Sequence, residues 1–351
     1  MESSGKDQRY EIKKELARGG LGTVYLANDK QLNRDVAIKR LHPQEDIDPE
    51  DMHNELMRES RILSRLKSAH IVTVFDVGRD DDGSFVVMEL LNGETLEELV
   101  SRAPMVEADF ISVAQQSLEG VIAAHSGGLI HSDLKPENFM ITWWPSGRFQ
   151  VKLLDFGIAS FVNAAHDEEE NDPGSMMGSI YFMAPEQFKK KPVDARTDIY
   201  SLGCVFYYAL TGRRPFDGEN SAQVMASHIQ NRFIGLDKAR PDLDPRIVEM
   251  VHAMIAKDPD ERFQTAIDVM KNVEYIQKTE RPVVQEQAIS SSGVRVNLTT
   301  APAPAVAPEA GEVQEEELPE EENLLANPII WIVAGVLFLV IIVVAYAVLS
   351  L

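Results

Sequence analysis

Three short polar motifs between residues 131 and 186 carry the residue types that phosphate chemistry needs. In chain order they read His131-Ser-Asp-Leu-Lys-Pro-Glu-Asn138, Leu154-Asp-Phe-Gly157 and Met183-Ala-Pro-Glu186. Phosphoryl transfer requires a metal that neutralises phosphate oxygens, a group that orients the attacking hydroxyl, and a cation beside the transferring phosphoryl group. An ordered set with carboxylate, amide and ammonium groups therefore predicts a phosphoryl-transfer site.

Four residues of the first two motifs have candidate roles in that chemistry. Asn138 and Asp155 carry hard oxygen donors of the kind that Mg²⁺ prefers, so we predict that they are metal ligands. Asp133 is the candidate acceptor of the proton of the attacking hydroxyl, and Lys135 is the candidate cation beside the phosphoryl group.

A glycine-rich turn near the N-terminus is a candidate phosphate loop. It reads Ala17-Arg-Gly-Gly-Leu-Gly-Thr-Val24, and backbone without side chains can approach phosphates closely. Alone, this turn is equally typical of a tight hairpin. The strand Val36-Ala-Ile-Lys39 follows and brings a lysine that could bind a nucleotide phosphate. The next helix offers Glu59 as a partner that would position this lysine, with Glu55 as a competitor.

Composition excludes some classes of function. The 351 residues carry a formal net charge of -22, and no basic stripe interrupts it, so nucleic-acid binding is not expected. The hydrophobic content of 44% is enough for a sizeable core. The one cysteine, Cys204, excludes an intramolecular disulfide and lies in an apolar run, which favours a buried, inert thiol in a reducing compartment.

Periodicity predicts a small strand-rich part followed by a helical part. Alternation predicts strands over 10–16, 22–28, 34–41, 71–78 and 84–90, and apolar spacing predicts helices over 50–66, 108–125, 198–210, 222–230, 245–255 and 266–274. A hairpin is expected after Asn138, with an enlarged tip over 143–148. Its adjacent tryptophans either dock a partner or pack on the large lobe, and we favour packing.

The two ends of the sequence are expected to lie outside this fold. Residues 1–9 form a short polar tail without the apolar region of a signal peptide. Residues 278–327 are a Pro/Ala/Glu-rich linker that we expect to be disordered. Residues 328–351 contain about 20 uncharged, apolar residues with Trp331 and Tyr346 near the ends, so we predict a C-terminal transmembrane helix.

At the quoted motifs the chain resembles the eukaryotic-type (Hanks-type) serine/threonine protein kinases, and most closely the bacterial membrane-anchored members. The resemblance runs over 10–277 and implies an α+β bilobal fold, with a β-rich N-lobe and a helical C-lobe. It also implies transfer of the γ-phosphate of ATP, with Mg²⁺ or Mn²⁺, to serine or threonine hydroxyls of protein substrates. The resemblance leads us to expect autophosphorylation. We also expect the catalytic domain to lie on the cytoplasmic face of a bacterial inner membrane.

The resemblance also assigns roles to individual residues. It implies Asp133, Lys135, Lys39 and Glu59 as catalytic residues, Asp198 as the brace of the catalytic loop, and Glu186 with Arg262 as a structural ion pair. Met88 matches the gatekeeper, and Glu89 to Leu91 match the hinge. The implied nucleotide-binding set is Ala17, Gly19, Gly20, Gly22, Val24, Ala37, Lys39, Met88, Glu89, Leu91, Asn138 and Asp155.

Two positions depart from the pattern of the family. Ala17 replaces the first glycine of the phosphate loop, and Ser132 replaces the arginine that usually precedes the catalytic aspartate. By the same resemblance, the Ser179 hydroxyl would contact Asp133 and Lys135. Three functions remain possible: an active kinase, a nucleotide-binding pseudokinase, and a membrane scaffold. Because every required residue type is present, we favour the active enzyme.

Overall fold

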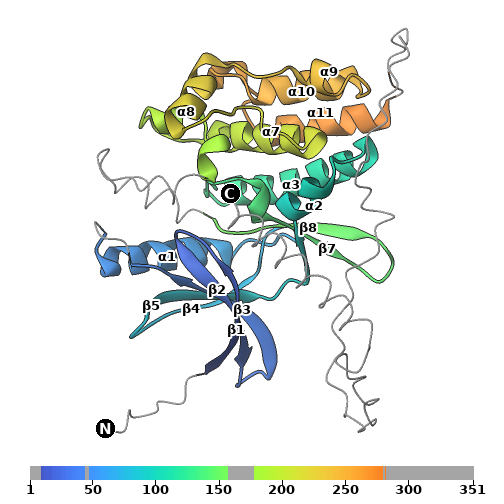
Figure 1. Cartoon of the computed structure of the whole chain (residues 1–351). Helices are drawn as coiled ribbons and strands as arrows, with labels where there is room; N and C mark the ends of the chain where they lie inside the picture. Colours follow the sequence, from blue (N-terminus) through green and yellow to red (C-terminus); the bar gives the residue numbers. More distant parts are fainter. Residues whose placement is uncertain (1–8, 44–46, 157–177, 280, 282–351) are drawn as a thin grey trace, which may run out of the picture. The chain divides into compact units, whose positions relative to one another are not determined.

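The computed structural model describes residues 9–43, 47–156, 178–279 and 281 (Figure 1). All of them belong to a first unit over 1–305, whereas the second unit, 306–351, lies outside the described residues. The predicted linker beyond 281 and the predicted transmembrane helix over 328–351 are therefore untested. Within the described ranges, no helix has both the length and the apolar character needed to cross a bilayer.

The N-terminal part contains the predicted strands, and they form one antiparallel sheet. Its strand order is β1-β2-β3-β5-β4, and its members are β1 (Tyr10–Arg18), β2 (Gly22–Asp29), β3 (Arg34–Leu41), β4 (Val74–Asp80) and β5 (Gly83–Glu89). Central β3 buries Val36, Ala37 and Ile38 in succession, because β-branched and small side chains here have a neighbouring strand on each side. The strand predicted from residue 71 begins only at Val74, since Ile71 forms an isolated bridge to Leu153.

Helix α1 (Pro49–Leu63) packs against β4 and β5. Asp48 caps it by accepting a hydrogen bond from the Glu50 backbone N–H, and Pro49 fits the first helical position because its missing N–H would have no intrahelical partner. The helix buries Met52, Leu56 and Glu59, so a carboxyl group is carried into the interior beside apolar side chains.

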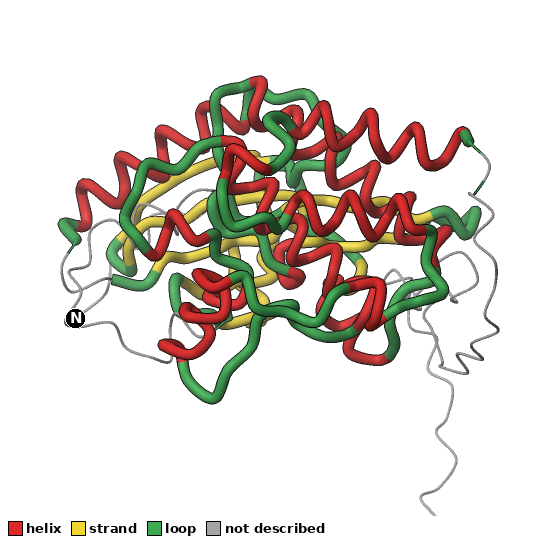
Figure 2. The backbone as a smooth tube through the Cα atoms, turned by 90° about the horizontal axis from the view of Figure 1, so that it is seen from above, coloured by secondary structure: helices red, strands yellow, loops and turns green. Residues whose placement is uncertain are grey.

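The C-terminal part is helical. It contains α2 (Leu96–Arg102), α3 (Glu107–Ser126), α6 (Pro185–Phe188), α7 (Ala195–Thr211), α8 (Ser221–Gln230), α9 (Leu236–Ala239), α10 (Pro245–Met254) and α11 (Ala266–Lys278). In Figure 1 these helices gather apart from the five-stranded sheet, and Figure 2 shows the same backbone from above with helices and strands in different colours. Helix α7 is buried from Thr197 to Leu210, including Cys204, which confirms the prediction of a buried thiol.

A second, three-stranded sheet connects the helical part to the catalytic motifs. It has the order β6-β7-β8, with β6 (Gly93–Thr95), β7 (Phe139–Trp143) and β8 (Phe149–Leu153). The predicted hairpin after Asn138 is β7 and β8. The prediction of packing holds for Trp143, which lies against the main core, but not for Trp144, which is 54% exposed at the tip.

Candidate active site

A fully buried carboxylate holds the backbone of the catalytic loop. Asp198 of α7 accepts hydrogen bonds from the backbone N–H groups of His131 and Ser132, each at 2.8 Å, and lies 2.8 Å from Nε2 of His125. Ser132 has a φ of +62°, a conformation that costs energy for a residue with a side chain. The bonds to Asp198 offset that cost, and the predicted brace is confirmed.

Further along the loop, three predicted site residues meet. Nζ of Lys135 lies 3.0 Å from Oδ2 of Asp133 and donates to Oγ of Ser179 at 2.8 Å. Asn138 donates its amide N–H to the Asp133 carbonyl at 2.8 Å, which leaves the amide oxygen of Asn138 directed away from that bond. Burial acts to lower the pKa of Lys135, but the Asp133 carboxylate outweighs it, so the pKa is raised and the lysine stays charged.

Asp155 is the second carboxylate of the site, and it faces Lys39. Its Oδ1 lies 2.9 Å from Nζ of Lys39, and its φ of +53° is again a left-handed conformation. The preceding carbonyl, of Leu154, contacts Nε2 of His131 at 2.8 Å, and the following ring, of Phe156, lies 4.4 Å from that imidazole. Burial acts to raise the pKa of Asp155, but the Lys39 ammonium outweighs it and the net pKa is lowered. Asp155 is thus an anion at neutral pH.

The predicted pair between Glu59 and Lys39 is not formed among the described residues. Lys39 reaches Asp155 instead, and the competitor Glu55 pairs with Arg58 at 2.7 Å. Glu59 is only 3% exposed, and burial, with the nearby Glu55 carboxylate second, raises the pKa of Glu59 to about 8. The sequence prediction failed here because two carboxylates compete for one ammonium, and residue types alone do not say which conformation wins.

The raised pKa of Glu59 predicts a pH effect on stability. A carboxyl group with a raised pKa keeps its proton in the folded state while the unfolded chain loses it, so the free energy of unfolding falls as pH rises from about 4.5 to about 8. Glu59→Gln should remove this decline and gain stability relative to the parent above pH 4.5. Urea unfolding across pH 4.5–8 measures this decline, with Glu249→Gln, at an exposed position of α10, as the control. Parallel pH profiles for Glu59→Gln and the parent would contradict the assignment.

The predicted phosphate loop joins β1 to β2. Ala17 pairs with Val24 across the two strands, and the backbone N–H of Gly19 donates to the carbonyl of Gly22 at 2.9 Å. Gly22 is required, because a Cβ there would lie 2.4 Å from the carbonyl oxygen of Arg40. Gly20 lies at the exposed turn between them, with its carbonyl 3.3 Å from Nδ1 of His42.

The residues assigned to the adenine side of the site share one apolar cluster. Ala37 on β3 pairs with Met88 on β5, both are buried, and Val24 and Leu91 pack against the same cluster.

Glu89 has a second role that the sequence did not reveal. Its Oε1 accepts from the Thr73 backbone N–H at 2.7 Å and from Nζ of Lys152 at 2.6 Å, so it ties the hinge to β8.

Glu137 is a residue of the site to which sequence reasoning assigned no role. Its carboxyl group lies beside Gly178, and its Oε2 is buried without a hydrogen-bond partner among the described residues. Burial raises the pKa of this carboxyl group, with the Lys135 ammonium acting against it. Its position within the catalytic loop, two residues after Lys135, was the only sequence signal.

The chain matches known proteins over the part that contains this site. The family described as protein kinase domain matches residues 10–276. A probable serine/threonine-protein kinase of Clostridium acetobutylicum is 34% identical over 75% of this chain and 39% of its own length. PrkC of Bacillus subtilis is 32% identical over 76% of this chain and 40% of its own length. PknL of Mycobacterium tuberculosis is 34% identical over 79% of this chain and 67% of its own length.

The solved structures agree on the fold. The PknI kinase domain of Mycobacterium tuberculosis superposes with a TM-score of 0.60 at 22% identity, covering 76% of this chain and 95% of that one. The chain spans less than half of the length of the first curated relatives it matches. Since the family match covers most of the sequence and the motifs assemble as described, the chain belongs to the protein kinase domain family.

Proposed function

We propose that the chain is a serine/threonine protein kinase that transfers the γ-phosphate of ATP to serine or threonine hydroxyls of proteins. One observation carries the proposal: Lys135 lies between Asp133 and Ser179, while the ionised Asp155 faces Lys39. Two charged pairs of this kind are what a site needs to position a hydroxyl and to neutralise phosphate charge. The names of the curated relatives, all serine/threonine-protein kinases, support the same activity.

Each residue of the site has a part in this reaction. The carboxylate of Asp133 accepts the proton of the substrate hydroxyl, and Lys135, held by Asp133 and Ser179, stays beside the transferring phosphoryl group. Lys39 binds the nucleotide phosphates as a point charge. In the described conformation it is paired with Asp155, so nucleotide binding would exchange that contact for phosphate oxygens.

The donors at Asn138 and Asp155 fit a magnesium ion. Asp155 is an ionised carboxylate, and the Asn138 amide has its N–H committed to Asp133, which leaves its oxygen as the donor. The ion, when bound, would supply neutralisation of the phosphate oxygens. The protein holds Asn138 on the catalytic loop, which Asp198 fixes at His131 and Ser132. It holds Asp155 on the segment after β8, whose Leu154 carbonyl contacts Nε2 of His131.

Incorporation of labelled phosphate from ATP tests the proposal. The purified chain is incubated with a mixture of acidic and basic carrier proteins, and the labelled amino acids are identified after hydrolysis. Phosphoserine and phosphothreonine are expected, both on the carriers and, as proposed autophosphorylation, on the chain itself. Nucleotide binding without incorporation would identify a pseudokinase, and absence of both would favour the scaffold reading.

We further propose that residues 328–351 anchor the kinase to a membrane, with the catalytic domain on the cytoplasmic side where ATP is found. The support is the uncharged apolar run in the sequence. The full chain should sediment with membranes, whereas a variant truncated after Asn327 should remain in the supernatant and keep its activity. Equal partitioning of the two proteins would contradict the anchor. Digestion of the kinase domain by protease added outside intact cells would contradict the orientation.

A further inference from the structure

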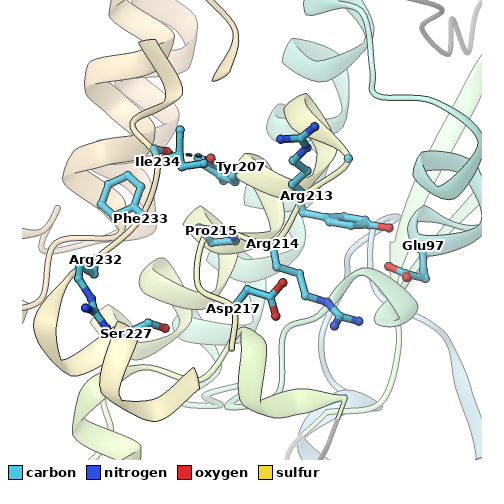
Figure 3. Close-up of a pocket in the computed structure, with 12 residues that line it drawn as sticks. Glu97, Tyr207, Arg213, Arg214, Pro215, Asp217, Ser227, Arg232, Phe233 and Ile234 are labelled. Atoms are coloured by element: carbon cyan, nitrogen blue, oxygen red, sulfur yellow. Dashed lines mark hydrogen bonds between the residues drawn. The ribbon is translucent and has the colours of Figure 1, made fainter. Parts of the chain in front are cut away.

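A cavity of about 800 Å³ opens at the C-terminal end of α7. Arg213 and Arg214 line it from the segment that follows α7, and Arg232 lines it from the segment that follows α8 (Figure 3). In a chain with a formal net charge of -22, three arginines around one cavity form a local exception. Such a group concentrates positive potential where an anionic partner could use it.

These arginines are available to a ligand. Over the ranges that the structure describes, none of the three takes part in an ion pair, whereas most of the other arginines do. Two acidic residues also line the cavity, but both are engaged elsewhere. The Glu97 carboxyl group helps burial to raise the pKa of the Tyr208 hydroxyl, which shows that the two groups interact, and Oδ1 of Asp217 accepts a hydrogen bond from the backbone N–H of Gly218 at 2.9 Å.

Arg214 links the cavity to the segment that contains Ser179. The guanidinium carbon of Arg214 lies 3.7 Å from the centre of the Tyr181 ring. Tyr181 is two residues from Ser179, which accepts the hydrogen bond from Lys135. Because an extended chain advances about 3.3–3.6 Å per residue, a peptide with its hydroxyl at Asp133 could place a neighbouring side chain at Arg214.

Glu97 and Glu137 argue for the opposite preference, for basic substrates, but more weakly. Of the two, only Glu97 lines the cavity, and three arginines line the same cavity. Arginine, in contrast, keeps its charge at any physiological pH and binds a carboxylate through two parallel hydrogen bonds.

We propose that Arg213 and Arg214 form a subsite for the carboxylate of an aspartate or glutamate close to the phosphoacceptor of protein substrates. This inference rests on the proposed kinase activity and adds a substrate class to it. Because both arginines are exposed, each contact is screened by water and salt, and the preference should be about threefold to tenfold. It should act mainly through KM, since the carboxylate binds equally in the ground state and the transition state.

A set of synthetic peptides tests the proposal with the full-length chain. Each peptide has one threonine in an alanine-rich background, and a single glutamate is moved from five residues before to five residues after it. One or two positions should show kcat/KM about threefold to tenfold above the peptide without glutamate, and the gain should shrink as salt is raised. A flat profile with measurable activity on every peptide would overturn the subsite alone. No activity on any peptide or carrier protein would instead overturn the kinase proposal.

Variants connect the preference to the two arginines. Arg213→Gln/Arg214→Gln should lose the gain from glutamate while keeping kcat on the peptide without glutamate. Arg214→Glu should favour lysine at the same position. The matched control is Arg148→Glu, which makes the same charge change at an exposed arginine of the β7–β8 tip and should keep the glutamate preference. Retention of the preference in the double variant would overturn the assignment.

A phosphoserine at the favoured position separates the two sources of an anionic group. A carboxylate subsite predicts that phosphoserine improves kcat/KM over glutamate by less than about tenfold. A larger improvement would overturn the carboxylate assignment and identify a subsite for substrates already phosphorylated at that position.

Discussion

Replacement of Asp155 by alanine is expected to lower phosphotransfer by roughly a thousandfold or more. The variant removes the carboxylate that we assign to the metal, and it also leaves Lys39 without its partner in the described conformation. The main effect should be on kcat, because the charge that the metal stabilises develops in the transition state. The measurement is the initial rate of phosphate incorporation at saturating ATP.

A control variant shows whether the lower rate comes from loss of the catalytic carboxylate or from loss of any negative charge. Asp81→Ala removes an exposed carboxylate in the turn between β4 and β5 and should leave the rate unchanged. Lys39→Met and Asp133→Asn should each lower the rate of phosphotransfer by a similar order of magnitude to Asp155→Ala. If purified Asp155→Ala phosphorylated its substrate at the parent rate, the metal assignment would be wrong.

The contact between Lys39 and Asp155 also explains why Glu59 has no ion-pair partner in the part of the chain that the structure describes. One ammonium cannot neutralise both carboxylates at full strength, and in the described conformation Asp155 holds it. Glu59 then sits buried, which favours its protonated form. A movement of α1 that brought Glu59 to Lys39 would release that proton, so the two arrangements differ in charge as well as in position.

The sequence predicted the order of the catalytic motifs well, because each motif is local. Strands β2 and β3, the hairpin after Asn138 and helix α7 follow from alternation or from continuous apolar runs. Short elements were missed. Helix α2 depends on the Thr95 and Glu98 capping box, and β6 pairs with β7 across more than forty residues of chain. Neither produces a long periodic pattern.

Contacts between distant charged groups were the least predictable part of the site. The hydrogen bonds from Thr73 and Lys152 to Glu89 depend on how β5 and β8 lie together, and the partner of Lys39 depends on the position of α1. Residue types identify which groups can pair, but the pairs that form are set by packing. The contacts of Asp198 with the catalytic loop were predictable only through the resemblance to the family.

The buried pair of Glu186 and Arg262 should give the largest effect on stability. Two parallel hydrogen bonds of 2.8 and 2.9 Å join the groups, and the carbonyls of Ala256, Arg196 and Lys257 accept the other N–H groups of the arginine. Arg262→Met would leave Glu186 buried, with the hydroxyl of Thr197 as its remaining side-chain partner among the described residues. Removing one member of a buried pair costs about 3–5 kcal/mol, whereas replacing both members by apolar groups is often close to neutral.

Urea unfolding at pH 7 should therefore show a loss of about 3–5 kcal/mol for Arg262→Met, and much of it should be regained in Glu186→Leu/Arg262→Met. Arg102→Met is the matched control, because Arg102 also binds a carboxylate through two bonds, to Glu94, but at an exposed position where a pair contributes about 0–1 kcal/mol.

The pH dependence of this stability difference provides a second check. Burial acts to raise the pKa of Glu186 but Arg262 outweighs it, so the pair's stabilisation is present at neutral pH and is lost as pH falls below about 4.5. The difference between parent and Arg262→Met should narrow over that range. A difference of equal size at pH 7 and pH 4 would show that the loss comes from packing around Tyr200, whose ring lies 4.6 Å from the guanidinium, and not from the uncompensated carboxylate.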